Sequence, residues 1–203
     1  MTRRGVCTQF LCCAAVTVLV TGCGTPRSPM PTWAAAYRAD PEFVVGARDA
    51  GRSRELMVFP GHYAPGEIVV SFGDRRLYYV ETRGHALSYP IAIPRAEDRW
   101  EGVTTVSDKR VNPSWIPTAE MMRENPKLPS YVPGGHPMNP LGVRALYLGT
   151  SAYRIHGTDA PWTIGEAASK GCIRMLNEHV LDLYERVEPG TRVTVTWSRF
   201  ALS

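Results

Sequence analysis

The sequence predicts a single, mainly β domain with one or two helices. Its 203 residues are enough for one hydrophobic core of ordinary size. The 18 glycines and 17 prolines suit a loop-rich β protein better than a helical bundle. From Gly66 onward, short runs of β-forming residues alternate with turn residues, as in strands linked by hairpins.

The expected strands are short, and turn residues separate them. They lie at residues 68–72, 77–80, 86–93, 145–148, 152–155 and 191–197. The alternation of apolar and basic residues in 152–155 places His156 at a strand end. A helix is expected from Asn177, as its N-cap, through Val187, and Pro189 with the following glycine stops it.

Two segments are harder to assign to regular structure. The apolar cluster at 54–59 is interpreted as a short strand or a flap. Prolines interrupt residues 94–142 and forbid regular central strands over most of that passage, so we assign none to it. An irregular insert of this size inside a compact domain more often forms a binding surface than a connecting loop without a function.

The N-terminus reads as an export signal. Residues 1–22 combine Arg3 and Arg4 with an apolar run at 10–20 that is too short to span a bilayer. The end of this segment resembles a bacterial lipobox, which makes Cys23 the expected lipidation site. The alternatives are an ordinary secretory cleavage site with a chance cysteine, or an uncleaved anchor.

The export signal sets the expected domain organisation and location. Residues 23–65 are expected to form a proline-containing tether and irregular segment, and residues 66–198 the folded domain. The protein is expected to be exported to the periplasmic cell envelope and held to a membrane by its N-terminal lipid.

The charge balance excludes one class of partner. Of the 23 Lys and Arg residues, Arg3 and Arg4 leave with the signal peptide, so the basic side chains exceed the 19 acidic ones by only two. A balance so close to neutral predicts no nucleic-acid partner. It also provides no polybasic patch for a membrane surface, so attachment depends on the lipid.

The cysteine count singles out one thiol. Of the five cysteines, three leave with the signal peptide and Cys23 is the lipid site, so Cys172 alone remains in the folded domain. An exported protein that keeps one unpaired thiol risks oxidation and intermolecular pairing, which suggests that the thiol has a task. The alternative is a small, buried, apolar cysteine.

The segment around Cys172 contains the residue types that thiol catalysis needs. Gly171 leaves the approach to the sulfur open, and His156 is the candidate base. Lys170 and Arg174 are expected to favour the thiolate or to engage a substrate carboxylate. Activation is assigned to His156 because the helix that begins at residue 177 starts too far beyond the cysteine for its dipole to act strongly.

The other histidines and aromatic residues have no clear part in this site. No set of ligands at a metal-binding spacing is present, so neither a metal nor a cofactor is expected. The histidines treated as ordinary are His62, His85, His136 and His179. The aromatic residues placed either in the cleft or in the core and surface are Trp115, Tyr131 and Trp162.

The motif as a whole resembles a known family. Ile155-His156-Gly157-Thr158, then Ile164-Gly165, then Ser169-Lys170-Gly171-Cys172-Ile173-Arg174-Met175 is similar to the signature of the L,D-transpeptidase catalytic domain, also called the YkuD-type domain. The glycine- and proline-containing segment 134–142 is also similar, with His136 as an extra residue. The resemblance covers roughly residues 66–197.

The resemblance implies a fold, a substrate and roles for individual residues. The fold would be a β-sandwich of mixed sheets, and the substrate a peptidoglycan stem peptide. Cys172 would attack the carbonyl before a terminal D-alanine, and an amine would resolve the thioester to form a cross-link. The carbonyl of Gly157 would orient His156, while Gly171, Arg174 and Ser169 would support the substrate, the oxyanion or the loop.

Several alternatives to this function remain open. Water could resolve the thioester, giving an L,D-carboxypeptidase, or a protein amine could, tethering an envelope protein to the wall. A non-catalytic wall-binding lipoprotein is a different class. A thiol oxidoreductase is disfavoured because no second cysteine is available. Residues 101–105 depart from a Thr-Pro-rich segment of the family, which leaves the edge of the substrate pocket open.

Overall fold

A computed structural model describes residues 53–200, so the expected signal peptide, Cys23 and most of the tether lie outside the described residues. Within 53–200, no helix is both long and apolar enough to cross a membrane. The elements are β1 (Glu55–Val58), β2 (Ile68–Ser71), β3 (Arg76–Thr82), β4 (His85–Pro94), η2 (Ala96–Asp98), β5 (Gly102–Val111), α3 (Ala119–Glu124), β6 (Arg144–Leu148), β7 (Arg154–His156), η3 (Pro161–Thr163), β8 (Ala167–Ser169), β9 (Ile173–Met175), α4 (Asn177–Arg186) and β10 (Arg192–Thr196).

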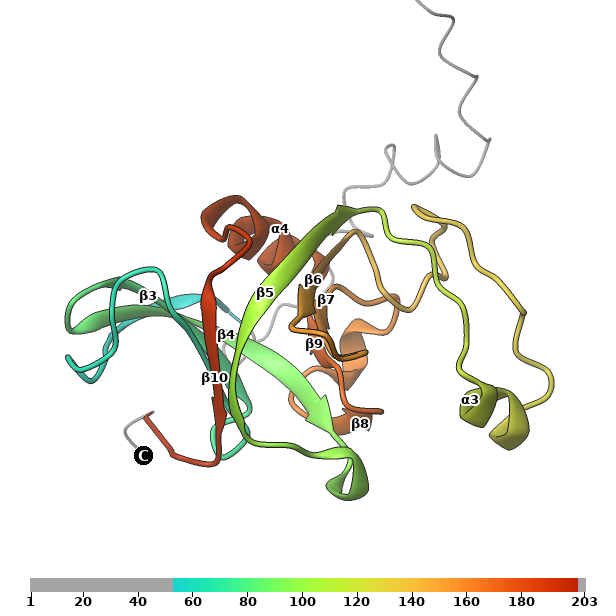
Figure 1. Cartoon of the computed structure of the whole chain (residues 1–203), viewed down its shortest axis with the longest axis horizontal. Helices are drawn as coiled ribbons and strands as arrows, with labels where there is room; N and C mark the ends of the chain where they lie inside the picture. The colour runs from blue at the N-terminus through green and yellow to red at the C-terminus, as the bar shows by residue number, and fades with distance from the viewer. Residues whose placement is uncertain (1–52, 201–203) are drawn as a thin grey trace, which may run out of the picture.

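The strands form two curved halves that share β4 and β5 (Figure 1). One half runs in the order β1-β4-β3-β2-β10-β5, and the other continues β5-β6-β7-β9 and returns to β4 through its pairing with β9. Most neighbours are antiparallel, but β2 with β10, β7 with β9, and β4 with β8 are parallel. The prediction of a mainly β fold of mixed sheets is confirmed.

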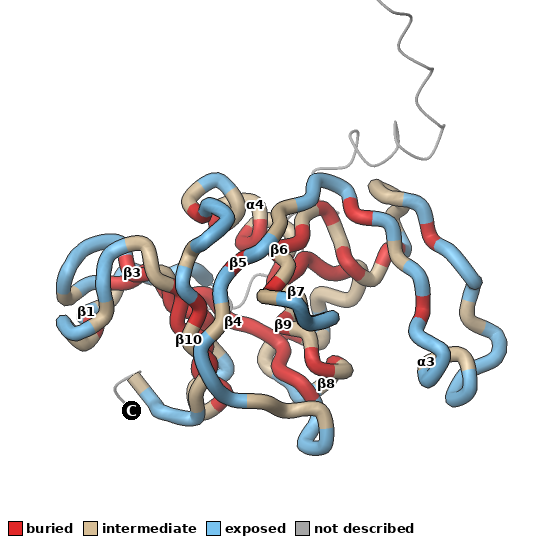
Figure 2. Tube along the Cα trace, in the orientation of Figure 1, coloured by how far each residue is buried: buried red, intermediate tan, exposed pale blue. Residues whose placement is uncertain are grey.

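The core fills the space between the two halves (Figure 2). Alternating side chains of both halves meet there, because successive residues of a strand point to opposite faces. Fully buried examples are Ile68 and Tyr89 from one half and Leu146 and Ile173 from the other.

The long passage 94–142 contains a strand that the sequence analysis did not assign. β5 occupies ten residues, and it pairs with both β10 and β6. It lies in the stretch between Pro94 and Pro113, where no proline removes a ladder hydrogen bond. The expectation of an irregular passage was wrong for this part, and β5 joins the two halves of the fold.

The start of the described chain also joins the sheet. β1 pairs antiparallel with β4, so the interpretation of 54–59 as a short strand is confirmed. Phe59 follows it and is buried in a small aromatic cluster with Tyr63, Tyr78 and Phe200. This cluster ties the N-terminal strand to the end of the described chain.

The second helix begins where predicted, but its capping differs. α4 packs on β6 and β7 and buries Val180 and Leu183. Leu176 is the N-cap and makes no side-chain capping bond, so the expectation that Asn177 caps the helix was wrong. The side chain of Asn177 instead bonds the backbone of neighbouring loops, which gives it a part in the site.

Candidate active site

The register of four strands builds one face of the site. Tyr147 of β6 pairs with Asp108 of β5 and with Arg154 of β7. Two residues along the strands, Ala145 pairs with Arg110 and His156, and His156 also pairs with Arg174 of β9. Cys172 comes one residue before Ile173, whose partner is Ile155, so its place is beside Arg154. Residues two apart on a strand share a face. Cys172, Arg174, Arg154 and His156 therefore form a compact group on two parallel strands.

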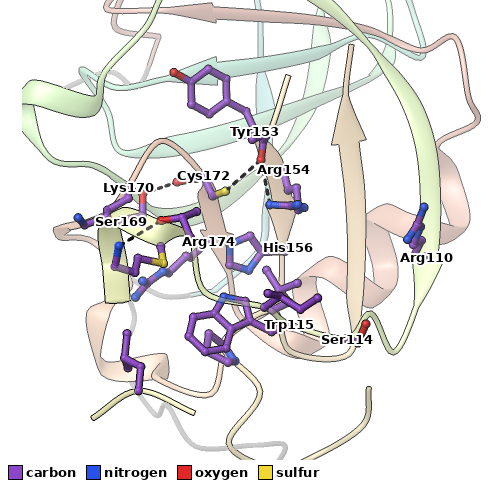
Figure 3. A pocket seen from close by; sticks show the side chains of 17 residues that line it. Arg110, Ser114, Trp115, Tyr153, Arg154, His156, Ser169, Lys170, Cys172 and Arg174 are labelled. Atoms are coloured by element: carbon purple, nitrogen blue, oxygen red, sulfur yellow. Dashed lines mark hydrogen bonds between the residues drawn. The ribbon is translucent and has the colours of Figure 1, made fainter. Parts of the chain in front are cut away.

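These four side chains line a cavity of about 440 Å³ (Figure 3). Its size is within the usual range for small-molecule and peptide-side-chain sites. Residues of the long passage 94–142 form one wall, among them Trp115, Met121 and Leu128. The interpretation of that passage as a binding surface is consistent with this position.

The ring of His156 is held in one orientation and one tautomer. Its Nδ1 lies 2.5 Å from the carbonyl oxygen of Gly157. Because a carbonyl only accepts, Nδ1 carries the proton and donates it, which leaves Nε2 as the free base. Burial and the positive charge of Arg174 lower the pKa of His156 to about 3. The imidazole is therefore neutral at physiological pH.

The sulfur of Cys172 is less deeply buried than His156, because Cys172 is only partly shielded from solvent. It lies 3.9 Å from the carbonyl oxygen of Ala152. Burial raises the pKa of the Cys172 thiol, although the backbone and charge of Arg154 and the charge of Arg174 oppose this shift. Arg174 therefore acts on the thiol in the expected direction, but desolvation outweighs it. Desolvation of both groups favours a neutral thiol beside a neutral imidazole.

Gly171 allows the chain to place Cys172 against the strand that bears Arg154. Its φ is +87°, a conformation that other residues adopt at a cost, and a β-carbon there would lie 2.2 Å from Cε1 of Tyr153. The Tyr153 ring in turn stacks on Trp100 at 5.0 Å, and the Trp100 indole donates to the Gly171 carbonyl at 3.2 Å. These contacts hold the loop immediately before the thiol.

Ser169 and Lys170 both bond away from the sulfur. The hydroxyl of Ser169 donates to the carbonyl of Cys172, as expected of a residue that supports the loop. Lys170 pairs with Glu124 and, at 3.5 Å, with Glu120 of α3. Its charge is therefore engaged by carboxylates rather than directed at the thiol, and it links α3 to the cysteine loop.

Asn177 connects the histidine loop to the preceding strand. Its Oδ1 accepts from the backbone N–H of Thr158 at 3.2 Å and of Val143 at 3.3 Å. A β-carbon on either Gly142 or Gly157 would lie 2.2 Å from this same oxygen. Both glycines are therefore needed for the close approach of the amide.

Arg174 is a half-buried cation at the base of the cavity. Its Nε has no hydrogen-bond partner among the described residues. Desolvation lowers the pKa of Arg174, while the nearby Asp159 carboxylate opposes the shift. Arg174 is thus positioned to meet a negative charge that enters the cavity.

The three aromatic residues that the sequence placed either in the cleft or elsewhere differ in their positions. Trp115 lines the cavity, whereas Tyr131 and Trp162 are exposed and lie outside its lining. Within 53–200, no group of three or more His, Cys, Asp or Glu side chains is arranged to hold a metal. The departure at 101–105 falls in β5, on its pairing with β10, away from the cavity wall.

The sequence matches the L,D-transpeptidase catalytic domain family, YkuD, over residues 65–195. The chain belongs to this family. It is 36% identical over 185 residues to the probable L,D-transpeptidase ErfK/SrfK of Escherichia coli, covering 82% of this chain and 59% of that protein. It is 35% identical over 163 residues to the putative L,D-transpeptidase YkuD of Bacillus subtilis, covering 80% of this chain and 85% of the relative.

The fold of the family is recovered at lower sequence identity. An L,D-transpeptidase from Mycobacterium smegmatis superposes with a TM-score of 0.50 at 18% identity, over 65% of this chain and 58% of the other. The chain spans 59%, 47% and 44% of the length of three E. coli and Salmonella typhimurium family members. Family membership and fold are thus established for the domain.

The sequence analysis did not single out two residues of the site. Arg154 was noticed only as part of an alternating strand, although its position two residues before His156 on the same face signalled that both line the cavity. Asn177 was assigned a capping role because asparagine is a favoured N-cap residue. No pattern in the sequence could show that its side chain turns toward Thr158.

Proposed function

We propose that this family member is a peptidoglycan L,D-transpeptidase with Cys172 as nucleophile and His156 as general base. The observation that carries the proposal is the pairing of β7 with β9, which places the thiol and the imidazole on one face of one cavity. The hydrogen bond from His156 Nδ1 to Gly157 supports it, since that bond leaves Nε2 able to accept a proton.

The first half-reaction begins from the neutral pair. As Sγ of Cys172 attacks the carbonyl carbon of the stem peptide, the thiol proton passes to Nε2 of His156. The tetrahedral intermediate then collapses, and the bond to the D-alanine nitrogen breaks. That nitrogen takes the proton from His156, D-alanine leaves, and a thioester remains on Cys172.

The second half-reaction transfers the acyl group. The amine of a second stem peptide attacks the thioester carbonyl, and its proton passes to His156. The carbon–sulfur bond breaks, the cross-link forms, and the proton returns to the sulfur. Arg174 and the backbone N–H of Gly171 stabilise the negative charge that develops on oxygen, while Ser169 holds the carbonyl of Cys172 in place.

The alternatives differ in the acceptor and not in the first step. Water as acceptor gives an L,D-carboxypeptidase, and a protein amine gives attachment of an envelope protein. An expected export signal and a lipid on Cys23 would place the domain at the peptidoglycan in the periplasm, anchored to a membrane. No metal or other cofactor takes part in the proposed chemistry.

The decisive experiment incubates the protein with muropeptides that carry tetrapeptide stems and follows their masses. Loss of D-alanine with formation of dimers supports transpeptidation, and loss of D-alanine alone identifies the carboxypeptidase. Cys172→Ala is expected to abolish both the release of D-alanine and the formation of dimers. Cys23→Ala removes the expected lipidation site instead, and it is expected to retain both activities in assays without detergent. Full turnover by Cys172→Ala would refute the mechanism.

A second test is independent of the acceptor. A carbapenem mimics the acyl donor, so its ring carbonyl is expected to form an adduct with Cys172 that mass spectrometry locates. Complete absence of both turnover and adduct, with Cys172 intact, would favour the non-catalytic wall-binding protein.

A further inference from the structure

The cavity has an unbalanced charge. Its lining includes four cationic side chains and no carboxylate; the cations are Arg110, Arg154, Lys170 and Arg174. Three of them have an acidic neighbour elsewhere. Lys170 pairs with two glutamates of α3, Arg110 pairs with Asp108 at 2.8 Å, and Arg174 interacts with Asp159.

Arg154 has no such neighbour. It forms no ion pair with any residue of 53–200. Its Nη1 donates to the carbonyl of Ala152 at 2.9 Å, and its Nε is buried with no hydrogen-bond partner among the described residues. A guanidinium in a partly dry site without a counter-charge is costly, so a bound anion would offset that cost.

The guanidinium of Arg154 is also held rigidly. Its Cζ lies 4.8 Å from the centre of the Tyr147 ring, and Arg110 lies at the same distance from that ring. Stacking of this kind fixes the plane of the guanidinium, so a carboxylate would meet donors that are held in one orientation. An ordered donor edge loses little conformational entropy when it binds a carboxylate.

The position of Arg154 relates it directly to the thiol. The Ala152 carbonyl that accepts from Arg154 is also the oxygen that Cys172 Sγ approaches, as the two dashed lines in Figure 3 show. The thiol and the Arg154 guanidinium are thus neighbours across one backbone oxygen, 3.9 Å from Sγ and 2.9 Å from Nη1. Arg174 is on the neighbouring strand, next to His156.

We propose that Arg154 is a specificity-determining residue that binds a free carboxylate flanking the attacked carbonyl of the acyl donor. The inference rests on the proposed function and deepens it. The preferred donors are peptides that carry a carboxylate next to the scissile bond, either at the C-terminus of the leaving residue or on the side chain of the attacked residue. Donors in which that carboxylate is a carboxamide are disfavoured.

A test that requires no peptidoglycan compares two thiol reagents on the full chain. Iodoacetate carries a carboxylate and iodoacetamide does not, and both react with the same thiolate. The ratio of their rates at Cys172, followed by mass spectrometry of its peptide, therefore cancels any change in the pKa of the thiol. Arg154→Gln is expected to lower the iodoacetate-to-iodoacetamide ratio roughly tenfold, as loss of a charge-assisted hydrogen bond predicts.

The matched control is Arg144→Gln. Arg144 also donates to a backbone carbonyl, stacks on a tyrosine and has a buried Nε without a partner, but it lies outside the cavity lining. Its substitution is expected to change the ratio less than twofold. Arg154→Lys, which keeps the charge and loses the planar donor edge, is expected to retain part of the preference. An unchanged ratio in Arg154→Gln would overturn the proposal.

The second test uses peptide donors and separates the two carboxylates. Three tetrapeptides are compared: one with both carboxylates free, one with a C-terminal carboxamide, and one with a side-chain carboxamide. The wild-type protein is expected to prefer the free acid over at least one amide by roughly tenfold in kcat/KM, and Arg154→Gln to reduce that preference to less than threefold. Preferences that Arg154→Gln leaves intact would refute this inference.

Failure of the proposed function gives a different result. If no donor is turned over while the iodoacetate preference depends on Arg154, the carboxylate site stands and the transpeptidase assignment fails. If donors are turned over while neither preference depends on Arg154, the enzyme assignment stands and this inference fails.

Discussion

The side-chain amide of Asn177 holds the backbone of Thr158 from both sides. Its Oδ1 accepts from the Thr158 N–H at 3.2 Å, and its Nδ2 donates to the Thr158 carbonyl at 3.0 Å. Thr158 follows Gly157, whose carbonyl orients the ring of His156. The first residue of α4 thus positions the candidate base through the loop between them.

Substitution of Asn177 is expected to affect the chemical step more than binding. Asn177→Ala removes both contacts, so we expect kcat to fall between about tenfold and a hundredfold while KM changes little, since a misplaced base slows proton transfer. Asn177→Asp keeps the acceptor and replaces the donor by a second oxygen that repels the Thr158 carbonyl, so an intermediate loss is expected.

Two measurements separate positioning from folding. NMR of His156 is expected to show a weaker Nδ1–H hydrogen bond in Asn177→Ala, and Asn125→Ala, an exposed residue after α3, serves as the control. An unchanged Nδ1–H signal together with an equal loss of stability and activity would indicate a purely structural role.

A pair of glycines separates backbone strain from crowding at the thiol. Gly171 and Gly190 have nearly the same positive φ, +87° and +95°, but a β-carbon meets Tyr153 at the first position and nothing within 4 Å at the second. Gly190→Ala is therefore expected to cost only about 1–2 kcal/mol of unfolding free energy. Gly171→Ala is expected to cost more and to slow alkylation of Cys172, because Tyr153 or the loop must move. Equal unfolding free energies and equal alkylation rates would contradict the role assigned to Gly171.

The ion pairs of Lys170 are expected to restrain α3 without adding much stability. The partner carboxylates are more than half exposed, at 61% and 52%, so Lys170→Met should leave the unfolding free energy almost unchanged. Hydrogen exchange at the amides of 119–124 should nevertheless accelerate, because the link to the cysteine loop is lost. Lys127→Met, at an exposed lysine of the same passage, is the control. Exchange that stays unchanged in Lys170→Met would argue against the restraint.

Two buried histidines predict a loss of stability in acid. Burial is the main cause that lowers the pKa of His156 to about 3 and of His179 to about 4. Above pH 6.5 both residues are neutral in the folded and unfolded states, so neither alters stability there. As the pH falls below about 6.5, the two histidines become protonated in the unfolded chain but stay neutral in the folded protein. The unfolding free energy therefore decreases by up to about 1.4 kcal/mol per pH unit for each histidine.

Denaturation at pH values between 7 and 4 measures this slope. His179→Phe is expected to make the decline shallower, since it removes one of the two groups and keeps the aromatic contact with Tyr89, whose ring lies 5.7 Å away. His85→Asn, at an exposed position, is expected to leave the slope as it is. The same slope in His179→Phe and the wild type would show that His179 protonates freely in the folded protein.

How well the sequence predicted each strand depends on how few neighbouring residues encode it. Alternation over a few residues places β7 and His156, and turn residues bound β2, β3 and β4. β5 was missed because the density of prolines over the whole passage was given more weight than the proline-free stretch inside it. Local composition therefore predicted most strands, but it missed β5, where an average hid a regular segment, and the three-residue strands β8 and β9.

The sequence by itself determined the family, most of the strands, and the two residues on which the proposed chemistry depends, because a lone cysteine, a strand-end histidine and their glycines are local features of the chain. Only the tertiary structure decided the charge state of that pair. Whether cations or desolvation prevail at Cys172 depends on how much water the surrounding strands exclude, and the packing excludes enough to raise its pKa. The register of β7 with β9 likewise placed Arg154 beside the thiol. Such placements depend on contacts between segments far apart in the chain, whose geometry is set only when the core closes.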